Sequence, residues 1–285
     1  MLTCYLRGGL GNQLFQILTT LICSLVNNVD FYFLESEVLY VGSPRATYWK
    51  DFLIEFSLYL KSKHQPNTRM IKEKGFHYTD ISKELEITED TKNGSYHTCL
   101  NGYFQSYKYF DKHYSFIYSI LNLKEKKEKV MEKIVLKFDL SKTVSMHFRA
   151  GDYYNLQQIH PIQSFSYYQE ALDFVIKNDT HIKTVYYFRE IKDAFHVSKY
   201  IKALQNTFPK LYFIPVNDNL LDWEQMLMMS NCKHNIIANS TFSWWGAYFN
   251  TNESKIVCYP NKWFGPQGPQ NTNDMCPPSW IRIGL

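Results

Sequence analysis

The chain has 285 residues and a formal net charge of +4, and 45% of its residues are hydrophobic while 20% are charged. This composition excludes a disordered chain and is typical of a soluble globular protein. The length is sufficient to bury a large core, and we expect two domains. The charge is too small for wrapping a nucleic-acid backbone, so we predict no nucleic-acid partner; a local basic pocket for a small anion is compatible with it.

The cysteines and the first residues narrow the class of protein further. The six cysteines, at positions 4, 23, 99, 232, 258 and 276, show no paired two-residue spacing, so neither a zinc ribbon nor a thioredoxin-like site is indicated. We expect buried free thiols. The opening residues lack the pattern of a secretory signal, and no apolar run is long enough to span a bilayer. We therefore expect a cytoplasmic protein without a membrane anchor.

Residues 1–35 are predicted to form a strand, a turn, a helix and a second strand. The turn is Gly8-Gly9-Leu10-Gly11, and Asn12 is a candidate helix cap. Glycines before a helix expose backbone N–H groups where the helix dipole also favours an anion. The turn lacks both the dinucleotide fingerprint and the P-loop ending, so a purely structural tight turn remains an open alternative.

The middle of the chain carries weaker signals. Residues 36–120 mix aromatic and polar segments without clean periodicity, and we expect only helices and loops there. Lys124–Phe138 is predicted to be an amphipathic helix, in which Val130 and Ile134 lie on the apolar face and the Lys and Glu residues form ordinary solvated surface. We place the domain boundary at the end of this helix, giving domains 1–140 and 141–285.

The stretch Thr143–Tyr154 is the first that concentrates chemistry. Val144, Met146 and Phe148 alternate with polar residues, the period of a strand, and Gly151 allows a sharp turn. His147, Arg149 and Asp152 are thereby directed towards one strand end, where ligands sit in open parallel sheets. An arginine fork there suits a phosphate or diphosphate. The alternative is an Arg149–Asp152 ion pair that closes the turn.

Strands alternate with helices over the remaining residues. A helix is predicted from Ser166, with Gln169 as its capping-box partner, and another from Asp222. A third helix carries Val197, Ile201, Leu204 and Phe208 on one face. Strands are predicted at 184–188, 211–214, 235–238 and, as the last one, 255–258, and residues 266–279 are loop. This alternation indicates an α/β fold with a parallel sheet covered on both faces.

A second chemical stretch follows the strand at 235–238. Hydroxyls on Ser240, Thr241 and Ser243 lie where a strand leads into a helix, so they can cap the helix and, with its free N–H groups, hold phosphate oxygens. Any helix start has this appearance, so a structural cap is equally open. Trp244 and Trp245 are predicted to pack in the core.

Three segments now stand in order along the chain. They are Gly8-Gly9-Leu10-Gly11-Asn12-Gln13-Leu14-Phe15-Gln16, His147-Phe148-Arg149-Ala150-Gly151-Asp152-Tyr153 and Asn239-Ser240-Thr241-Phe242-Ser243-Trp244-Trp245-Gly246-Ala247. Together, and with Asn231-Cys232-Lys233-His234-Asn235-Ile236-Ile237 before the third, they resemble the α-1,2-fucosyltransferase family, glycosyltransferase family 11. The resemblance implies two facing Rossmann-like domains of the GT-B type, of which the N-terminal one is the acceptor side.

The resemblance also implies the reaction. The expected enzyme is an inverting α-1,2-fucosyltransferase that moves L-fucose from GDP-fucose to the 2-hydroxyl of a terminal sugar, usually galactose, of a glycan acceptor. No cofactor and no metal are expected. In agreement, no Asp-x-Asp pair for holding a metal on a nucleotide diphosphate occurs in the sequence, so protein groups would have to meet the charge on the departing GDP.

By the same resemblance, Arg149 is expected on the β-phosphate, and His147 is expected to orient that site or contact a phosphate. Asp152 is the candidate proton acceptor or a support for Arg149, and His160 is an alternative base. The predicted catalytic residues are therefore Arg149, Asp152 and His147. The predicted donor-binding residues are Gly9, Gly11, Asn12, Arg149, Asn239, Ser240, Thr241, Phe242 and Ser243.

Two departures from the family pattern keep alternatives open. Ala150 stands where many members carry a second arginine, and residues 188–193 lack a paired aspartate that bacterial relatives often show. A non-catalytic protein that binds nucleotide sugars or glycans is therefore one alternative, and a transferase for another GDP-sugar is the second.

Overall fold

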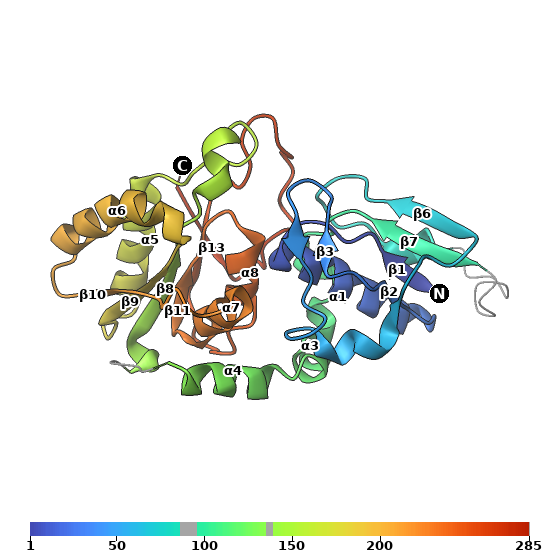
Figure 1. Ribbon diagram of the computed structural model, residues 1–285. Helices are drawn as coiled ribbons and strands as arrows, with labels where there is room; N and C mark the ends of the chain where they lie inside the picture. Colours follow the sequence, from blue (N-terminus) through green and yellow to red (C-terminus); the bar gives the residue numbers. More distant parts are fainter. Residues whose placement is uncertain (86–95, 135–138, 285) are drawn as a thin grey trace. The chain divides into compact units, whose positions relative to one another are not determined.

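The computed structural model describes residues 1–85, 96–134 and 139–284. The chain divides into two compact units. Unit 1 comprises Met1–Leu123 and Asn271–Pro277, and unit 2 comprises Lys124–Gln270 and Pro278–Leu285. Each unit has its own parallel sheet (Figure 1). The α/β class is thus confirmed, and the division of function between residues 1–140 and 141–285 stays a prediction.

Unit 1 is built on a three-stranded sheet with the order β1-β7-β6, in which both pairs are parallel. Its strands are β1 (Leu2–Cys4), β6 (Thr68–Lys72) and β7 (His97–Asn101). Two small pairs accompany it: β2 (Phe33–Leu34) with β5 (Leu60–Lys61), and β3 (Val38–Leu39) with β4 (Arg45–Ala46). The expectation of only helices and loops in 36–120 was therefore wrong, because these short strands carry too little alternation to be recognised.

The long helix α1 (Leu10–Asn27) packs against β1, and α3 (Tyr114–Ile120) lies near the end of unit 1. Nearly all residues of α1 from Leu10 to Ser24 are buried, and most of them are apolar, so packing in the core explains its stability. It ends at Asn28, whose left-handed conformation (φ 50°) caps it. The residue that caps its start is Gly9 and not Asn12, which lies in the first turn.

Unit 2 contains a fully parallel six-stranded sheet with the order β10-β9-β8-β11-β12-β13. Its strands are β8 (Thr143–His147), β9 (Thr184–Phe188), β10 (Tyr212–Pro215), β11 (His234–Ile236), β12 (Val257–Pro260) and β13 (Ile281–Ile283). In chain order this is 3-2-1-4-5-6, the order of the doubly wound nucleotide-binding sheet. The strand order therefore reverses between β8 and β11.

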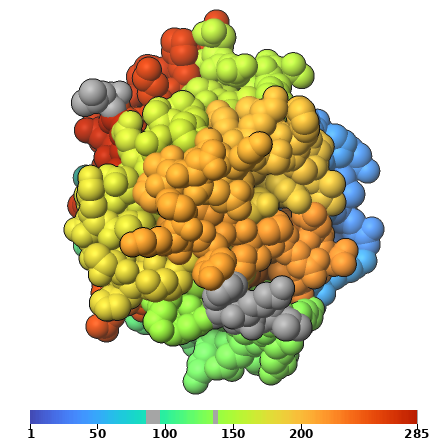
Figure 2. Space-filling view, turned by 90° about the vertical axis from the view of Figure 1, so that its left-hand side faces the viewer, coloured from blue at the N-terminus to red at the C-terminus, as the bar shows by residue number. Residues whose placement is uncertain are grey.

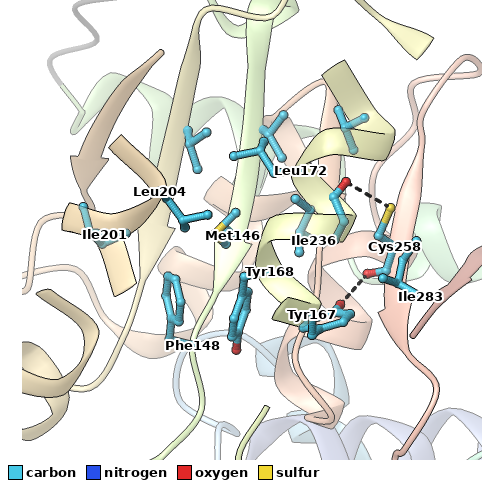
Figure 3. Close-up of a cluster of buried hydrophobic side chains, with 14 of the residues drawn as sticks. Met146, Phe148, Tyr167, Tyr168, Leu172, Ile201, Leu204, Ile236, Cys258 and Ile283 are labelled. Atoms are coloured by element: carbon cyan, nitrogen blue, oxygen red, sulfur yellow. Dashed lines mark hydrogen bonds between the residues drawn. The ribbon is translucent and has the colours of Figure 1, made fainter. Parts of the chain in front are cut away.

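Helices cover both faces of this sheet, as predicted. The helices α5 (Phe165–Asn178) and α6 (Ala194–Thr207) share an apolar core with Met146, Ile236 and the other strand residues that point the same way (Figure 3). The helices α7 (Asp222–Asn231) and α8 (Thr241–Tyr248) pack against each other on the second face. There, Asn235 donates to Ser145 Oγ at 2.7 Å and to Met229 O of α7 at 2.8 Å.

Figure 2 looks onto the surface of unit 2 in which α6 and β10 cover one edge of the sheet. On α6, Phe195 is 76% exposed, and Ile191, which precedes the helix, is 67% exposed. Lys199 lies over the Phe195 ring, at 4.6 Å from its centroid.

Several predictions for unit 2 need correction. Ser164, and not Ser166, caps α5 by accepting from Tyr167 N at 3.3 Å. The last strand is β13, because a three-residue strand after a Pro- and Gly-rich segment gives no pattern of its own. The predicted helix 124–138 is present as α4 (Leu123–Glu132), while Phe138 lies outside the described residues.

The predicted charged surface of α4 has one exception. Lys127 is buried, and its Nζ donates to Ser230 O at 3.3 Å and Phe249 O at 3.2 Å. The prediction was right for Trp244 and Trp245, which are fully buried, and for the six cysteines, which are buried and free. Among the helices described, none is long and apolar enough to cross a membrane.

Candidate functional site

Arg149 lies just beyond the carboxyl end of β8. Phe148 N donates to Phe188 O at 2.9 Å, which continues the pairing of β8 with β9 and places Arg149 at the edge of the sheet. Its side chain is only 20% exposed, and its Nη2 donates to Asp152 Oδ1 at 2.5 Å. Its Nη1 donates to Glu190, the second residue after β9. The predicted pair Arg149–Asp152 is thus present, together with a carboxylate that the sequence did not predict.

The loop after β8 is held by the segment after β9. Gly151 adopts φ +41°, and its N–H donates to both carboxylate oxygens of Asp193, at 3.0 and 2.9 Å. Asp193 is 3% exposed, so this contact is an interior one. The neighbouring Ala150 is also buried, at 2% exposed. The position at which many family members carry a second arginine therefore faces the protein interior in this chain.

Glu190 and its neighbours form a charged group at the end of β9. Glu190 Oε2 accepts from Lys192 Nζ at 2.7 Å. Arg189 turns the other way and contacts both carboxylate oxygens of Asp218, at 2.9 and 3.3 Å. The sequence prediction for residues 188–193 concerned only the missing paired aspartate. It did not recognise Glu190, an acidic residue two positions after a strand that neighbours β8.

His147 is buried beside this group. Its ring lies 5.6 Å from that of Phe242, and its Nδ1 is a buried atom without a hydrogen-bond partner. Burial, with a smaller effect of the Arg149 charge, lowers the pKa of His147 to about 3. The imidazole is therefore neutral at physiological pH, and it can orient or accept at the site but cannot add a positive charge.

The start of α8 lies on the other side of the position where the strand order reverses, since β11 pairs with β8. Ser240 is the N-cap residue, but its side chain makes no capping hydrogen bond. Thr241 and Phe242 are half-buried in the first turn. The first N–H groups of a helix and its dipole favour an anion at this point.

The side chains of two other predicted donor-binding residues form hydrogen bonds within the protein. Asn239 Nδ2 donates to Pro161 O at 2.9 Å and Trp263 O at 3.0 Å, and Ser243 Oγ donates to Ser240 O at 3.3 Å. Both side chains therefore hold the loop and the first turn in place. Asn239 Oδ1 is buried without a partner. Their donor-binding roles stay predictions.

Aromatic rings line the loop that follows Arg149. The guanidinium carbon of Arg149 lies 5.1 Å from the Tyr153 ring centroid, and Tyr153 Oη donates to Asn239 O at 3.1 Å. The Tyr153 ring stacks on His160 with centroids 4.8 Å apart. Burial lowers the pKa of His160, with Asp152 opposing this shift and Arg149 adding to it. The His160 ring also lies 5.6 Å from that of Phe264, so this candidate base packs between two segments.

In unit 1, the glycine-rich segment forms the turn between β1 and α1. Gly8 has φ +78°, and a Cβ built there would lie 2.4 Å from Asn12 Nδ2. Gly9 has open space around the same position. Asn12 Oδ1 accepts from Gln105 Nε2 at 3.0 Å. Gly9, Gly11 and Asn12 therefore lie together at the start of α1, Gly9 as its N-cap residue and the other two in its first turn.

The side chains of the two glutamines of this motif, Gln13 and Gln16, hold the turn in place through hydrogen bonds. Gln13 Nε2 donates to Gly8 O at 3.0 Å and Ala46 O at 2.8 Å. Gln16 Oε1 accepts from Arg7 N at 3.0 Å, and its Nε2 donates to Arg7 O at 3.2 Å. Both side chains are fully buried. They fix the backbone that precedes the helix.

A second polar group at the carboxyl edge of the unit 1 sheet was missed in the sequence. Glu73, directly after β6, accepts from Tyr103 N at 2.7 Å and Phe104 N at 2.9 Å. Burial raises the pKa of Glu73 to about 7, although these two hydrogen bonds and Arg7 oppose the shift. Arg7 Nη2 donates to Asn101 Oδ1 at 2.7 Å. No local pattern links these residues, which lie up to 97 positions apart in the sequence.

No group of three or more His, Cys, Asp or Glu side chains able to hold a metal ion occurs within 1–85, 96–134 and 139–284.

The chain matches a known protein family and is similar to several known proteins. Residues 1–283 match the family described as Glycosyl transferase family 11. The O-antigen biosynthesis glycosyltransferase WbnK of Escherichia coli is 28% identical over 99% of this chain and 100% of its own length. An α-1,2-colitosyltransferase of the same species is 28% identical over 98% and 97%. A galactoside 2-α-L-fucosyltransferase of Caenorhabditis elegans is 24% identical over 100% of this chain and 79% of its own length.

Proposed function

Because the chain belongs to glycosyl transferase family 11, we propose that it transfers L-fucose from GDP-fucose to the 2-hydroxyl of a terminal galactose of a glycan. The proposed reaction inverts the donor linkage and needs no metal. The family is shown by the match over nearly the whole chain. The observation that carries the proposal is Arg149, a half-buried guanidinium at the carboxyl edge of the sheet, beside the position where the strand order reverses.

Arg149 would meet the diphosphate through its fork of N–H donors. In the structure both of its terminal nitrogens donate to carboxylates. A diphosphate offers oxygens of the same geometry and more charge, so it can take the place of either carboxylate. As the bond between fucose and the β-phosphate breaks, negative charge grows on the leaving GDP, and a fixed guanidinium stabilises it.

The start of α8 would supply the second set of donors. Ser240 and Thr241 precede or open the helix, and its first N–H groups point out of the helix end. The loop bearing Arg149 and the loop bearing Ser240 follow adjacent strands, β8 and β11. Such a pair of loops is where doubly wound sheets bind nucleotides. The protein wall of this proposed site would be formed by His147, Asn239, Phe242 and Ser243.

Asp152 would hold Arg149 in place, since its carboxylate already accepts from the guanidinium. As the alternative proton acceptor for the attacking hydroxyl, it would have to exchange this partner. For the chain as a whole we propose a GT-B-type pair of Rossmann-like domains. In this arrangement unit 1 is the acceptor side, and Gly9, Gly11 and Asn12 also bind the donor.

One observation favours a second candidate function. The colitosyltransferase matches this chain at 28% identity over almost the full length of both chains, whereas the fucosyltransferase matches at 24%. Transfer of colitose is therefore the alternative donor chemistry. Since both reactions move a deoxysugar, the same Arg149 electrostatics would serve either one.

The test is transfer by the purified protein. We would incubate it with GDP-fucose or GDP-colitose and a panel of β-galactosides, with and without a chelator, and read GDP release and the product linkage by NMR. The expected result is an α-1,2-linked fucose in the presence of chelator. Arg149→Ala should abolish it, and Arg282→Ala, an exposed arginine on β13, should not. A clear preference for GDP-colitose would overturn the fucose assignment.

A further inference from the structure

Glu190 lies just beyond the carboxyl end of β9, next to the strand that carries Arg149. β8 is the first strand of the doubly wound order, and β9 is the second and lies directly beside it. The register pairs His147 with Phe188, so Arg149 and Glu190 leave the sheet at the same edge. In sheets of this topology, an acidic side chain at the end of the second strand accepts hydrogen bonds from ribose hydroxyls.

Among the described residues, three carboxylates contact the segment just after β8, and their contacts distinguish them. Asp193 is 3% exposed, and both of its oxygens accept from Gly151 N. Asp152 lies on the loop after β8 and is held by Arg149. Glu190 follows the second strand, and its side chain is 38% exposed. Glu190 is therefore the carboxylate in the place of a ribose acceptor.

The loop after β8 passes close to Glu190. A Cβ built on Gly151 would lie 3.2 Å from Glu190 Oε1 and 3.3 Å from Oε2. The backbone of this loop and the carboxylate are thus in close approach, which brings a ligand held by the loop within reach of Glu190.

The charges around Glu190 are compatible with a change of partner. Its Oε1 accepts from Arg149, and its Oε2 accepts from Lys192, whose side chain is 60% exposed. Arg189 pairs with Asp218 and therefore does not neutralise Glu190. When a diphosphate takes the Arg149 guanidinium, Oε1 loses its donor, while Lys192 still donates to Oε2. Two vicinal hydroxyls can then donate to it.

We propose that Glu190 binds the ribose diol of the nucleotide donor and selects a ribonucleotide over a deoxyribonucleotide. This inference rests on the proposed function, since it takes the ligand to be GDP-linked. It adds a specificity residue for the ribose of the nucleotide donor.

The test is nucleotide binding without turnover. Titration calorimetry would compare GDP with 2′-deoxy-GDP on the wild-type protein and on Glu190→Gln. One hydrogen bond to a charged group corresponds to a change in Kd of about tenfold or more. Wild type should therefore bind GDP at least about tenfold more tightly than 2′-deoxy-GDP, and Glu190→Gln should reduce this ratio towards one.

Asp152→Asn is the matched control, because it removes the other carboxylate partner of Arg149. It should leave the ratio of the two dissociation constants at its wild-type value, whatever it does to each of them. Equal binding of GDP and 2′-deoxy-GDP by wild type, or an unchanged ratio in Glu190→Gln, would overturn the role of Glu190 while leaving the donor assignment intact. A wild-type protein that binds neither nucleotide would overturn both.

Discussion

Arg149 donates to Glu190 across the ends of two adjacent strands, 41 residues apart in the chain. The same guanidinium donates to Asp152, so a cation at the edge of the sheet is balanced by two carboxylates. A diphosphate bound as proposed would have to replace at least one of them. The two contacts hold the guanidinium in a fixed orientation, which is the preorganisation that its proposed electrostatic role requires.

Arg149→Ala should lower kcat/KM for transfer by about 100-fold or more, the scale of losing a charge-stabilising donor. The fold should persist, because the side chain lies at a strand end and supports little core packing. Initial rates and thermal unfolding measure the two effects. Arg149→Lys keeps the charge without the fork and should give an intermediate rate. Near-normal turnover in Arg149→Ala would remove this residue from the mechanism.

Local pattern was sufficient to predict the strands that carry the site. The alternation at 143–148 and the β-rich run at 184–188 predicted β8 and β9, and the charged Arg149 and Asp152 just beyond β8 predicted the pair that the structure contains. The glycines at 8–11 and the hydroxyls at 240–243 predicted the starts of α1 and α8 to within about two residues.

Contacts between distant segments were not predictable in this way. Glu190 is an ordinary acidic residue in its own segment, and it becomes part of the site only because β9 pairs with β8. Glu73 similarly gains its buried environment from the loop after β7. β7 itself was missed because His97–Asn101 alternates poorly, although it is the central strand of its sheet. Tertiary pairing determines these features.

Gly8 and Gly9 offer a matched pair of substitutions. Gly8→Ala should destabilise the protein by about 1–2 kcal/mol, since Gly8 has φ +78° and a Cβ would collide with Asn12 Nδ2. Gly9→Ala should leave the free energy of unfolding within about 0.5 kcal/mol, because φ is −76° and the space is open. Chemical denaturation measures both values.

The same pair tests whether Gly9 contacts a ligand. If Gly9 is a donor-binding residue, Gly9→Ala should weaken donor binding while the fold stays intact, as measured by titration calorimetry with GDP-fucose. Unchanged affinity in a stable Gly9→Ala protein would limit this turn to a structural role.

His147 should make the protein sensitive to acid. Its pKa is about 3 in the folded protein, where burial is the main cause, against about 6.5 in an unfolded chain. Between these values the unfolded state binds a proton that the folded state does not. The free energy of unfolding should therefore fall as the pH decreases below 6.5, by up to about 1.4 kcal/mol per pH unit from this residue.

Urea unfolding of wild type and His147→Gln between pH 4 and 7 isolates the contribution of His147. Other titrating groups are common to both proteins, so the difference between their free energies of unfolding should narrow as the pH is lowered. Parallel curves would mean that His147 is not neutral in the folded protein.

Lys127 should stabilise unit 2 through the ends of two helices. Its Nζ donates to Ser230 O of α7 and to Phe249 O just after α8, both of which are carbonyls with no helical partner. Lys127→Met keeps the length of the side chain and removes both donors. We expect the free energy of unfolding to fall by about 1–3 kcal/mol at pH 7, the scale of leaving buried acceptors unsatisfied. Urea denaturation measures this change.

Lys124→Met is the control for Lys127, since Lys124 is an exposed residue of the same helix, and it should change the free energy of unfolding by less than about 0.5 kcal/mol. The pH adds a second test. Burial, with the nearby Lys255, lowers the pKa of Lys127 to about 8, so between pH 8 and about 10.5 the unfolded state binds the extra proton. The wild-type protein should gain stability relative to Lys127→Met as the pH rises through this range. A constant difference would show that Lys127 stays charged in the folded protein, held by the two carbonyls.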